Sequence, residues 1–245
     1  MQFYGSILLL SYTVNAHYNF PALVYEGKST DEYHYTRHRG DEWSDSPYLD
    51  VKSIDVRCGT APLLGKATGV LPVVAGSRLG FTVRTHEIIH PGPLQVYMAK
   101  VPEVETAETW SGEGKVWFKV YEEPFYMNDK QISWTSEGKT EVYFIIPAST
   151  PSGDYLVRVE HVALHSAHLG EYQIYVGCGQ VKVSSSSIAT PGPLVAFPGA
   201  YEESDPGIQV NIWGGITAYT PPGPTLWPSG TACLSQKELL EGNYI

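Results

Sequence analysis

The sequence predicts an all-β protein, an antiparallel β-sandwich. Short apolar runs are separated by turn signals along most of the chain, and no amphipathic helix of ordinary length lies between them. The 245 residues include 24 Gly and 18 Pro, and 12% are aromatic. Such a composition favours many short strands joined by turns over a helical bundle.

Seven runs carry the strand signal, and turns precede several of them. A Pro-Gly-Pro turn precedes the second run, a Glu-Gly-Lys turn the fourth and a Ser-Gly-Asp turn the fifth. The third run, Val-Trp-Phe-Lys-Val-Tyr, is interpreted as a strand with one buried face. In chain order the runs cover residues 80–83, 94–101, 116–121, 141–146, 155–164, 172–178 and 208–212.

The two ends of the chain differ from this pattern. Residues 1–16 have the features of a secretory signal, with an apolar run at 7–10 and small residues at the first and third positions of Val14-Asn15-Ala16. Cleavage after Ala16 makes His17 the new N-terminus. We therefore expect a secreted, extracellular protein.

One domain is expected over residues 17–228, followed by an atypical tail over 229–245. In the tail, Ser235 and Glu238 form a capping-box pattern, and Gly242 follows two leucines as a stop signal. This pattern predicts a short helix.

Charge and cysteine content narrow the function classes. The formal net charge of −10 argues against nucleic acid or an anionic membrane as a partner, and after the signal no apolar run approaches the length of a membrane span. We expect a soluble monomer. Of Cys58, Cys178 and Cys233, two are expected to pair in an oxidising compartment, which leaves one thiol over.

His17 and His90 suggest a metal site, and a separate polar pair lies later in the chain. An N-terminal His17 would offer an α-amine and an imidazole from one residue, a chelate that no internal histidine can make. His90 stands directly before the rigid Pro-Gly-Pro turn, which reduces the ordering that metal binding requires. If residues 172–178 form a strand, Gln173 and Tyr175 share one face of it.

These segments together resemble the fungal lytic polysaccharide monooxygenases of auxiliary activity family 9, formerly glycoside hydrolase family 61. Any one motif is weak, but their order and spacing over nearly the whole mature length are specific. The motifs are residues 17–21 (HYNFP), 55–58 (DVRC), 90–93 (HPGP), 96–102 (VYMAKVP), 116–122 (VWFKVYE), 152–161 (SGDYLVRVEH), 197–201 (FPGAY), 205–208 (DPGI) and 219–224 (YTPPGP).

The resemblance implies an immunoglobulin/fibronectin-like sandwich with one copper ion held by a histidine brace. The α-amine and imidazole of His17 and the imidazole of His90 would bind copper, with Tyr175 in the axial position. Nitrogen ligands in a plane suit Cu(II), and imidazole also tolerates Cu(I). His165 and Gln173 match the outer-sphere pair that contacts the oxidant. O₂ or H₂O₂ would be the co-substrate, and an external donor would supply electrons.

The resemblance also implies a disulfide between Cys58 and Cys178, with Cys233 free, and long loops that form a flat substrate face. Tyr219 matches an aromatic position on that face, and Trp43 and Tyr33 are weaker candidates. Such rings stack on the apolar faces of glucose units. The implied substrate is a crystalline or soluble β-1,4-glucan, cleaved at C1 or C4 or both.

Two other functions stay open. A protein with the same brace could bind copper without oxidising sugar, and it would lack the His165 and Gln173 pair and the surface aromatics. A conventional hydrolase would need two carboxylates about 5–10 Å apart across a sugar, and no motif indicates such a pair.

Overall fold

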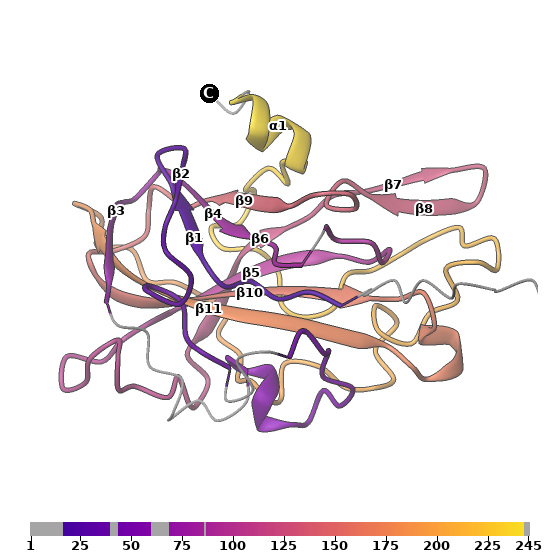
Figure 1. Ribbon diagram of the computed structural model, residues 1–245, viewed down its shortest axis with the longest axis horizontal. Coiled ribbons are helices and arrows are strands. Elements are labelled where there is room, and N and C mark those ends of the chain that lie inside the picture. Colours follow the sequence, from indigo (N-terminus) through magenta and orange to yellow (C-terminus); the bar gives the residue numbers. More distant parts are fainter. Residues whose placement is uncertain (1–16, 40–43, 60–68, 86, 243–245) are drawn as a thin grey trace, which may run out of the picture.

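Two β-sheets pack face to face in the computed structural model, which describes residues 17–39, 44–59, 69–85 and 87–242 (Figure 1). The four-stranded sheet has the order β2-β1-β4-β9. Its strands are β1 (Leu23–Tyr25), β2 (Lys28–Ser29), β4 (Arg78–Thr82) and β9 (Glu141–Ile145). All three of its strand pairs are antiparallel.

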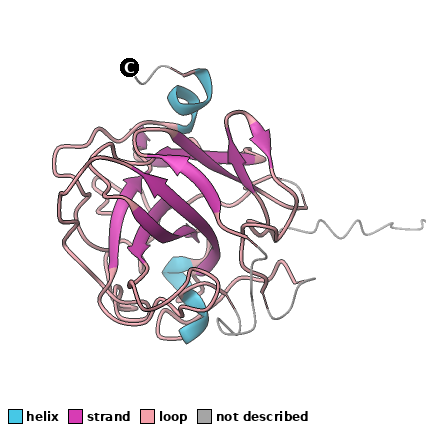
Figure 2. Cartoon of the chain, turned by 90° about the vertical axis from the view of Figure 1, so that its left-hand side faces the viewer, coloured by secondary structure: helices cyan, strands magenta, loops and turns pink. Residues whose placement is uncertain are grey.

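The five-stranded sheet has the order β3-β11-β10-β5-β6. Its strands are β3 (Leu71–Val74), β5 (Leu94–Lys100), β6 (Trp117–Glu122), β10 (Gly153–Ala163) and β11 (Gln173–Ser184). All pairs are antiparallel except β3 with β11. The predicted antiparallel sandwich is therefore confirmed. In Figure 2 the strands form the centre of the molecule and loops surround them.

Shorter elements complete the fold. A separate hairpin extends from the sandwich, and two 3₁₀ helices and one α-helix lie outside the sheets. These elements are β7 (Phe125–Asn128), β8 (Gln131–Trp134), η1 (Ile54–Val56), η2 (Ala167–Leu169) and α1 (Gln236–Glu241). No helix within the described ranges is long and apolar enough to span a membrane.

Six of the seven predicted strands are present, with no end shifted by more than six residues, and the seventh is wrong. Residues 208–212 form turns instead of a strand. Ile208 and Ile212 are both buried, as an alternating strand would require, but the amides of Ile208 and Gln209 donate to the Asp205 carbonyl. These two amides therefore bond within a local turn that begins at Asp205, and the two isoleucines pack into an apolar core.

Two apolar cores lie on opposite faces of the five-stranded sheet. One fills the sandwich and includes Tyr175, and the other lies beneath long loops and includes Cys178. The predicted disulfide joins Cys178 to Cys58 in this second core, and Cys233 is a free, exposed cysteine, as expected. The disulfide therefore ties a loop to the outer face of β11.

The short helix predicted in the tail is confirmed as α1, with both bonds of the Ser235 and Glu238 capping box. Leu239 is fully buried in the sandwich core. The Gln236 side chain accepts from the Tyr143 amide at 2.7 Å and donates to the Tyr143 carbonyl at 2.8 Å, so it pairs with the outer edge of β9. The domain boundary at residue 228 stays a prediction.

A buried carboxyl group lies close to this helix. Glu123 accepts hydrogen bonds from the amides of Ser136 and Leu94 and from the Thr135 hydroxyl. The Thr135 hydroxyl in turn accepts from the Gln236 amide at 2.9 Å. Burial raises the pKa of Glu123 to about 7, although these hydrogen bonds oppose the shift.

This raised pKa predicts a pH-dependent stability. The folded state binds the Glu123 proton more tightly than the unfolded chain, so its contribution to the free energy of unfolding is lost as the pH rises from about 4.5 to about 7. We expect the stability of the wild type relative to Glu123→Gln to fall by roughly 3 kcal/mol over that window. Urea unfolding of both proteins at a series of pH values measures this difference, and parallel curves would contradict it.

Candidate metal centre

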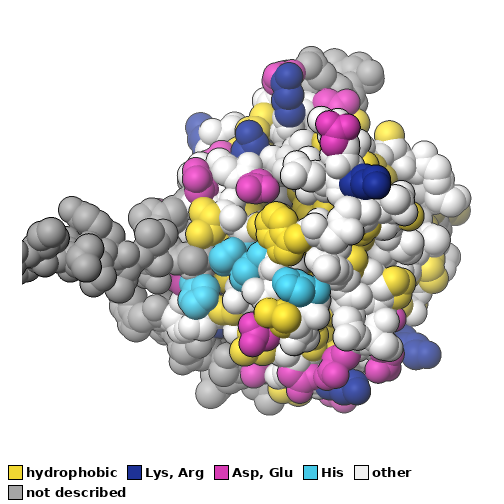
Figure 3. Space-filling model, turned by 90° about the vertical axis from the view of Figure 1, so that its right-hand side faces the viewer, with side chains coloured by type: hydrophobic (Ala, Val, Ile, Leu, Met, Phe, Trp, Pro, Cys, Tyr) yellow, Lys and Arg dark blue, Asp and Glu magenta, His cyan; other side chains and the backbone are white. Residues whose placement is uncertain are grey.

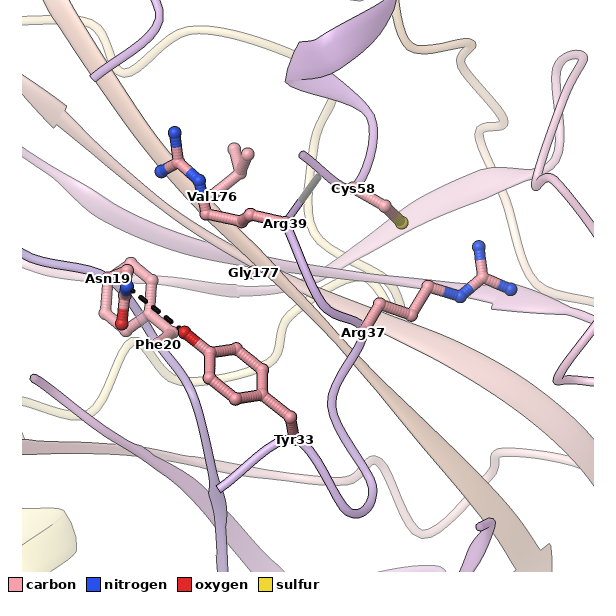
Figure 4. Close-up of a pocket in the computed structure, with 8 residues that line it drawn as sticks. All are labelled: Asn19, Phe20, Tyr33, Arg37, Arg39, Cys58, Val176 and Gly177. Carbon is pink, nitrogen blue, oxygen red and sulfur yellow. Dashed lines mark hydrogen bonds between the residues drawn. The ribbon is translucent and has the colours of Figure 1, made fainter. Parts of the chain in front are cut away.

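The N-terminal arm, residues 17–20, lies against strand β11 because β11 has a glycine at the contact. A Cβ atom on Gly177 would lie 2.8 Å from the Cβ atom of Phe20 and 3.1 Å from its carbonyl oxygen. Figure 4 shows Asn19 and Phe20 beside Gly177, around a small cavity of about 10 Å³. The absence of a side chain therefore lets the arm approach the sheet closely.

Side chains from an early loop hold the arm in place. The Asn19 amide nitrogen donates to the Asp45 carboxylate at 2.7 Å and to the Tyr33 hydroxyl at 3.3 Å, the second of which is the dashed line in Figure 4. The Arg84 amide donates to the Asn19 carbonyl at 3.0 Å. These bonds fix the arm two residues after His17.

His90 is held by the turn that follows it. The amide of Leu164 donates to the Pro91 carbonyl at 2.9 Å. A Cβ atom on Gly92 would lie 1.9 Å from the Val162 carbonyl oxygen, so only glycine allows this approach. The predicted role of the Pro-Gly-Pro turn thus has a structural basis, because the turn packs tightly on the end of β10.

Tyr175 lies at the centre of the predicted ligands. Its ring centroid is 6.3 Å from that of His17 and 6.2 Å from that of His90. The Tyr175 side chain is fully buried, and its hydroxyl donates to the Gln173 side-chain oxygen at 2.7 Å. Burial raises the pKa of Tyr175, so the phenol stays protonated at neutral pH. The two residues share a face of β11, as the sequence predicted.

His165 completes the cluster. It follows β10 and stacks on His90, with ring centroids 4.1 Å apart and an interplanar angle of 15°. Burial lowers the pKa of His165, and the nearby Glu171 carboxylate opposes that shift. Among the described residues, the His165 Nδ1 atom is buried and has no hydrogen-bond partner. A neutral imidazole at this position keeps one acceptor nitrogen and one donor nitrogen.

The donor set fits copper better than a metal that prefers carboxylates. The imidazoles of His17 and His90 lie with their ring centroids 6.3 and 6.2 Å from that of the Tyr175 phenol, and imidazole nitrogens suit both Cu(II) and Cu(I). In the described ranges no cluster of three or more His, Cys, Asp or Glu side chains could hold a metal.

The residues predicted for the substrate face do not lie together as the predicted copper ligands do. Tyr219 is only 8% exposed, its hydroxyl donates to the Gly207 carbonyl at 2.9 Å, and its ring packs edge-on against Phe125 and Trp134. The expectation of an exposed ring at Tyr219 is thus corrected, because the loop folds this ring into the second core. Trp43 lies outside the described residues.

Tyr33 is half-buried. Its ring stacks on His38 at 4.4 Å, and its hydroxyl accepts from Asn19 and Arg84. These contacts show that Tyr33 helps to hold the arm, and its place on the substrate face stays a prediction.

Two residues near the centre were missed by the sequence analysis. Trp213 is 64% exposed, and its indole nitrogen donates to the His165 carbonyl at 2.8 Å. His161 is fully buried between the arm and the His90 turn. For Trp213, the available sequence signal was an aromatic residue directly before two glycines, Gly214 and Gly215. For His161, the neighbouring sequence gives no sign that it differs from an ordinary core residue.

Histidine side chains gather on one face of the molecule, with large hydrophobic side chains beside them (Figure 3). The part of this face that the structure describes shows no deep hollow around the histidines. An extended, flat ligand suits such a surface better than a small molecule that requires a cavity.

Comparison with known sequences identifies a matching protein family and similar proteins. The profile of Auxiliary Activity family 9 (formerly GH61) matches residues 17–220. The chain is 51% identical over 89% of its length to AA9 family lytic polysaccharide monooxygenase C of Emericella nidulans, of which the match covers 94%. It is 45% identical over 91% of its length to AA9 family lytic polysaccharide monooxygenase H of Malbranchea cinnamomea, of which the match covers 97%.

Solved structures show the same fold. The extended catalytic domain of LPMO9A from H. jecorina superimposes with a TM-score of 0.78 at 23% identity, over 90% of this chain and 94% of that one. A cellulose-active polysaccharide monooxygenase from M. thermophila gives a TM-score of 0.72 at 26% identity, over 86% of this chain and 99% of that one.

The close approach at Gly177 generates a prediction. Gly177→Ala would force the arm away from β11, and overpacking of this kind costs roughly 1–3 kcal/mol. We expect a lower melting temperature together with weaker Cu(II) binding, measured by thermal denaturation and calorimetry. Gly192→Ala is a matched control, because no atom lies within 4 Å of its added Cβ. Equal behaviour of the two variants would show that the contact does not position the arm.

Proposed function

The chain belongs to Auxiliary Activity family 9, and on this basis we propose that it is a secreted copper enzyme that oxidatively cleaves cellulose or a related β-1,4-glucan. As a member of this family it is a lytic polysaccharide monooxygenase. We propose oxidation at C1, C4 or both, with O₂ or H₂O₂ as co-substrate and an external reductant. The observation that supports the proposal is one cluster in which the rings of His17 and His90 and the Gln173 side chain lie beside the buried Tyr175, with His165 stacked on His90.

The proposal includes processing of the chain. Removal of residues 1–16 would expose the α-amine of His17 and leave a mature domain over residues 17–228 with the tail attached. Residues 1–16 lie outside the described residues. The mature protein would act as an extracellular monomer.

Each residue of the centre has a distinct role in this proposal. His17 would bind one copper ion through its α-amine and imidazole, and His90 through its imidazole. Copper, when bound, supplies the one-electron chemistry that activates the oxidant. Tyr175 would lie beside the copper ion, where its buried ring would limit the access of water, and its hydroxyl donates to the Gln173 side-chain oxygen.

The outer residues would handle the proton and the substrate. His165, kept neutral by burial, can hold or deliver a proton at a ring nitrogen beside His90. The Gln173 amide nitrogen remains as a donor, because its oxygen is already bound to the Tyr175 hydroxyl. The exposed indole of Trp213, fixed beside His165, would stack on a glucose unit and bring the sugar chain over the centre.

The alternative is a copper-binding protein of the same fold that does not oxidise sugar. The position of His165 and Gln173 beside the ligands favours the enzyme, because storage of copper requires no proton donor there.

Incubation of the copper-loaded mature protein with cellulose and ascorbate tests the proposal. We expect oligosaccharides with an aldonic acid at C1, a ketone at C4, or both, detected by mass spectrometry. A chelator should abolish them and added Cu(II) restore them. Copper binding without oxidised products would indicate the alternative, and unoxidised products formed without copper would indicate a hydrolase.

Trp213 provides a second test. Trp213→Ala should weaken binding to insoluble cellulose about 2- to 10-fold, because loss of one stacked ring costs roughly 0.5–1.5 kcal/mol. Trp213→Phe should retain most of the affinity. Leu240→Ala on α1 removes another exposed apolar side chain and serves as the control. A pull-down isotherm measures the difference, and unchanged binding by Trp213→Ala would remove this residue from the substrate face.

A further inference from the structure

A chain of buried hydrogen bonds joins the two segments that carry the histidine ligands. The Tyr18 hydroxyl lies 2.6 Å from the His161 Nδ1 atom, and the His161 Nε2 atom lies 3.0 Å from the Gly92 carbonyl oxygen. Tyr18 directly follows His17, and Gly92 stands two residues after His90. His161 therefore bridges the arm and the turn from strand β10.

The direction of both hydrogen bonds follows from their partners. The Gly92 carbonyl can only accept, so the proton of a neutral imidazole is on Nε2. Nδ1 is then the acceptor, and the Tyr18 hydroxyl donates to it. His161 is fully buried, and burial lowers its pKa to about 3, in line with a neutral ring.

Packing makes this bridge stiff. The Tyr18 ring stacks on Tyr175 with centroids 4.0 Å apart and an interplanar angle of 19°. Gly92 cannot move toward β10, because it already touches the Val162 carbonyl. Tyr175 is also the register partner of His161 across the β10 and β11 pair. The bridge thus connects the arm, the turn and both central strands.

Packing of the apolar core does not explain why position 161 carries a polar side chain. The neighbours of His161 on the same face of β10 are Val159 and Ala163, both in the apolar sandwich core. Burial of a polar group costs free energy unless hydrogen bonds compensate, and here both ring nitrogens are used. An aliphatic residue would fill the space but would leave the arm and the turn unconnected.

We infer that His161 is a positioning residue, which sets through Tyr18 and Gly92 the geometry in which His17 and His90 present their nitrogens to a metal. The inference rests on the proposed copper site. It extends that site by a layer of residues that never touch the metal. Outer residues of this kind commonly change metal affinity 10- to 100-fold when they are removed.

Two variants test the bridge. Tyr18→Phe keeps the stacked ring and removes only the hydroxyl, and His161→Phe removes both hydrogen bonds. We expect each to weaken Cu(II) binding by about 10-fold or more and to shift the copper hyperfine coupling in the electron paramagnetic resonance spectrum. His161→Gln, which retains a donor and an acceptor, should recover part of both.

A control separates positioning from stability. Val157→Ala removes buried volume from the same face of β10, four residues from His161. It should lower the melting temperature and leave the copper spectrum unchanged. If Tyr18→Phe and His161→Phe behave in the same way, His161 is only a structural residue and the inference is wrong.

The protonation of the His161 ring in the metal-free protein provides an independent test. Nitrogen-15 NMR of the His161 ring should show a neutral imidazole with its proton on Nε2, and a proton on Nδ1 would contradict the bridge. Failure of the wild type to bind Cu(II) would overturn the proposed function and this inference together. Wild-type binding with unaltered variants would overturn the inference alone.

Discussion

The N-terminal arm reaches the ligand cluster because strand β11 leaves room for it at Gly177. The arm has no strand partner over its first two residues, so its position depends on packing and on side-chain bonds. Phe20 fills the space above the glycine, and Tyr18 stacks on Tyr175. Asn19, between them, is bound to Asp45. Since the arm carries His17, any change that lifts it from β11 moves the proposed copper ligand.

The pair formed by β10 and β11 organises the rest of the site. Its sandwich face carries His161 and Tyr175 in register, and the end of the same pair leads into His165 and Gln173. Its opposite face carries Cys178, whose disulfide anchors the loops of the second core. One two-stranded unit thus holds both His165 and Gln173, and the proposed metal site requires such preorganised support.

Sequence reasoning predicted the sandwich, six strands, the disulfide and the capped tail helix, because each has a local signal or a family motif. It also brought together His17, His90 and Tyr175. It was wrong for residues 208–212 and for the exposure of Tyr219, because the burial of a loop depends on contacts distant in the sequence. The bridging role of His161 was invisible for the same reason, since its partners stand 143 and 69 residues away.

We propose that the α-amine of His17 completes the copper site. Cu(II) titration of two purified proteins tests this proposal, one beginning at His17 and the other retaining Ala16 before it. We expect one tightly bound Cu(II) with an axial, nitrogen-rich paramagnetic resonance spectrum for the first protein only. Equal affinity and identical spectra for both proteins would contradict it, because the amine would then not be a ligand.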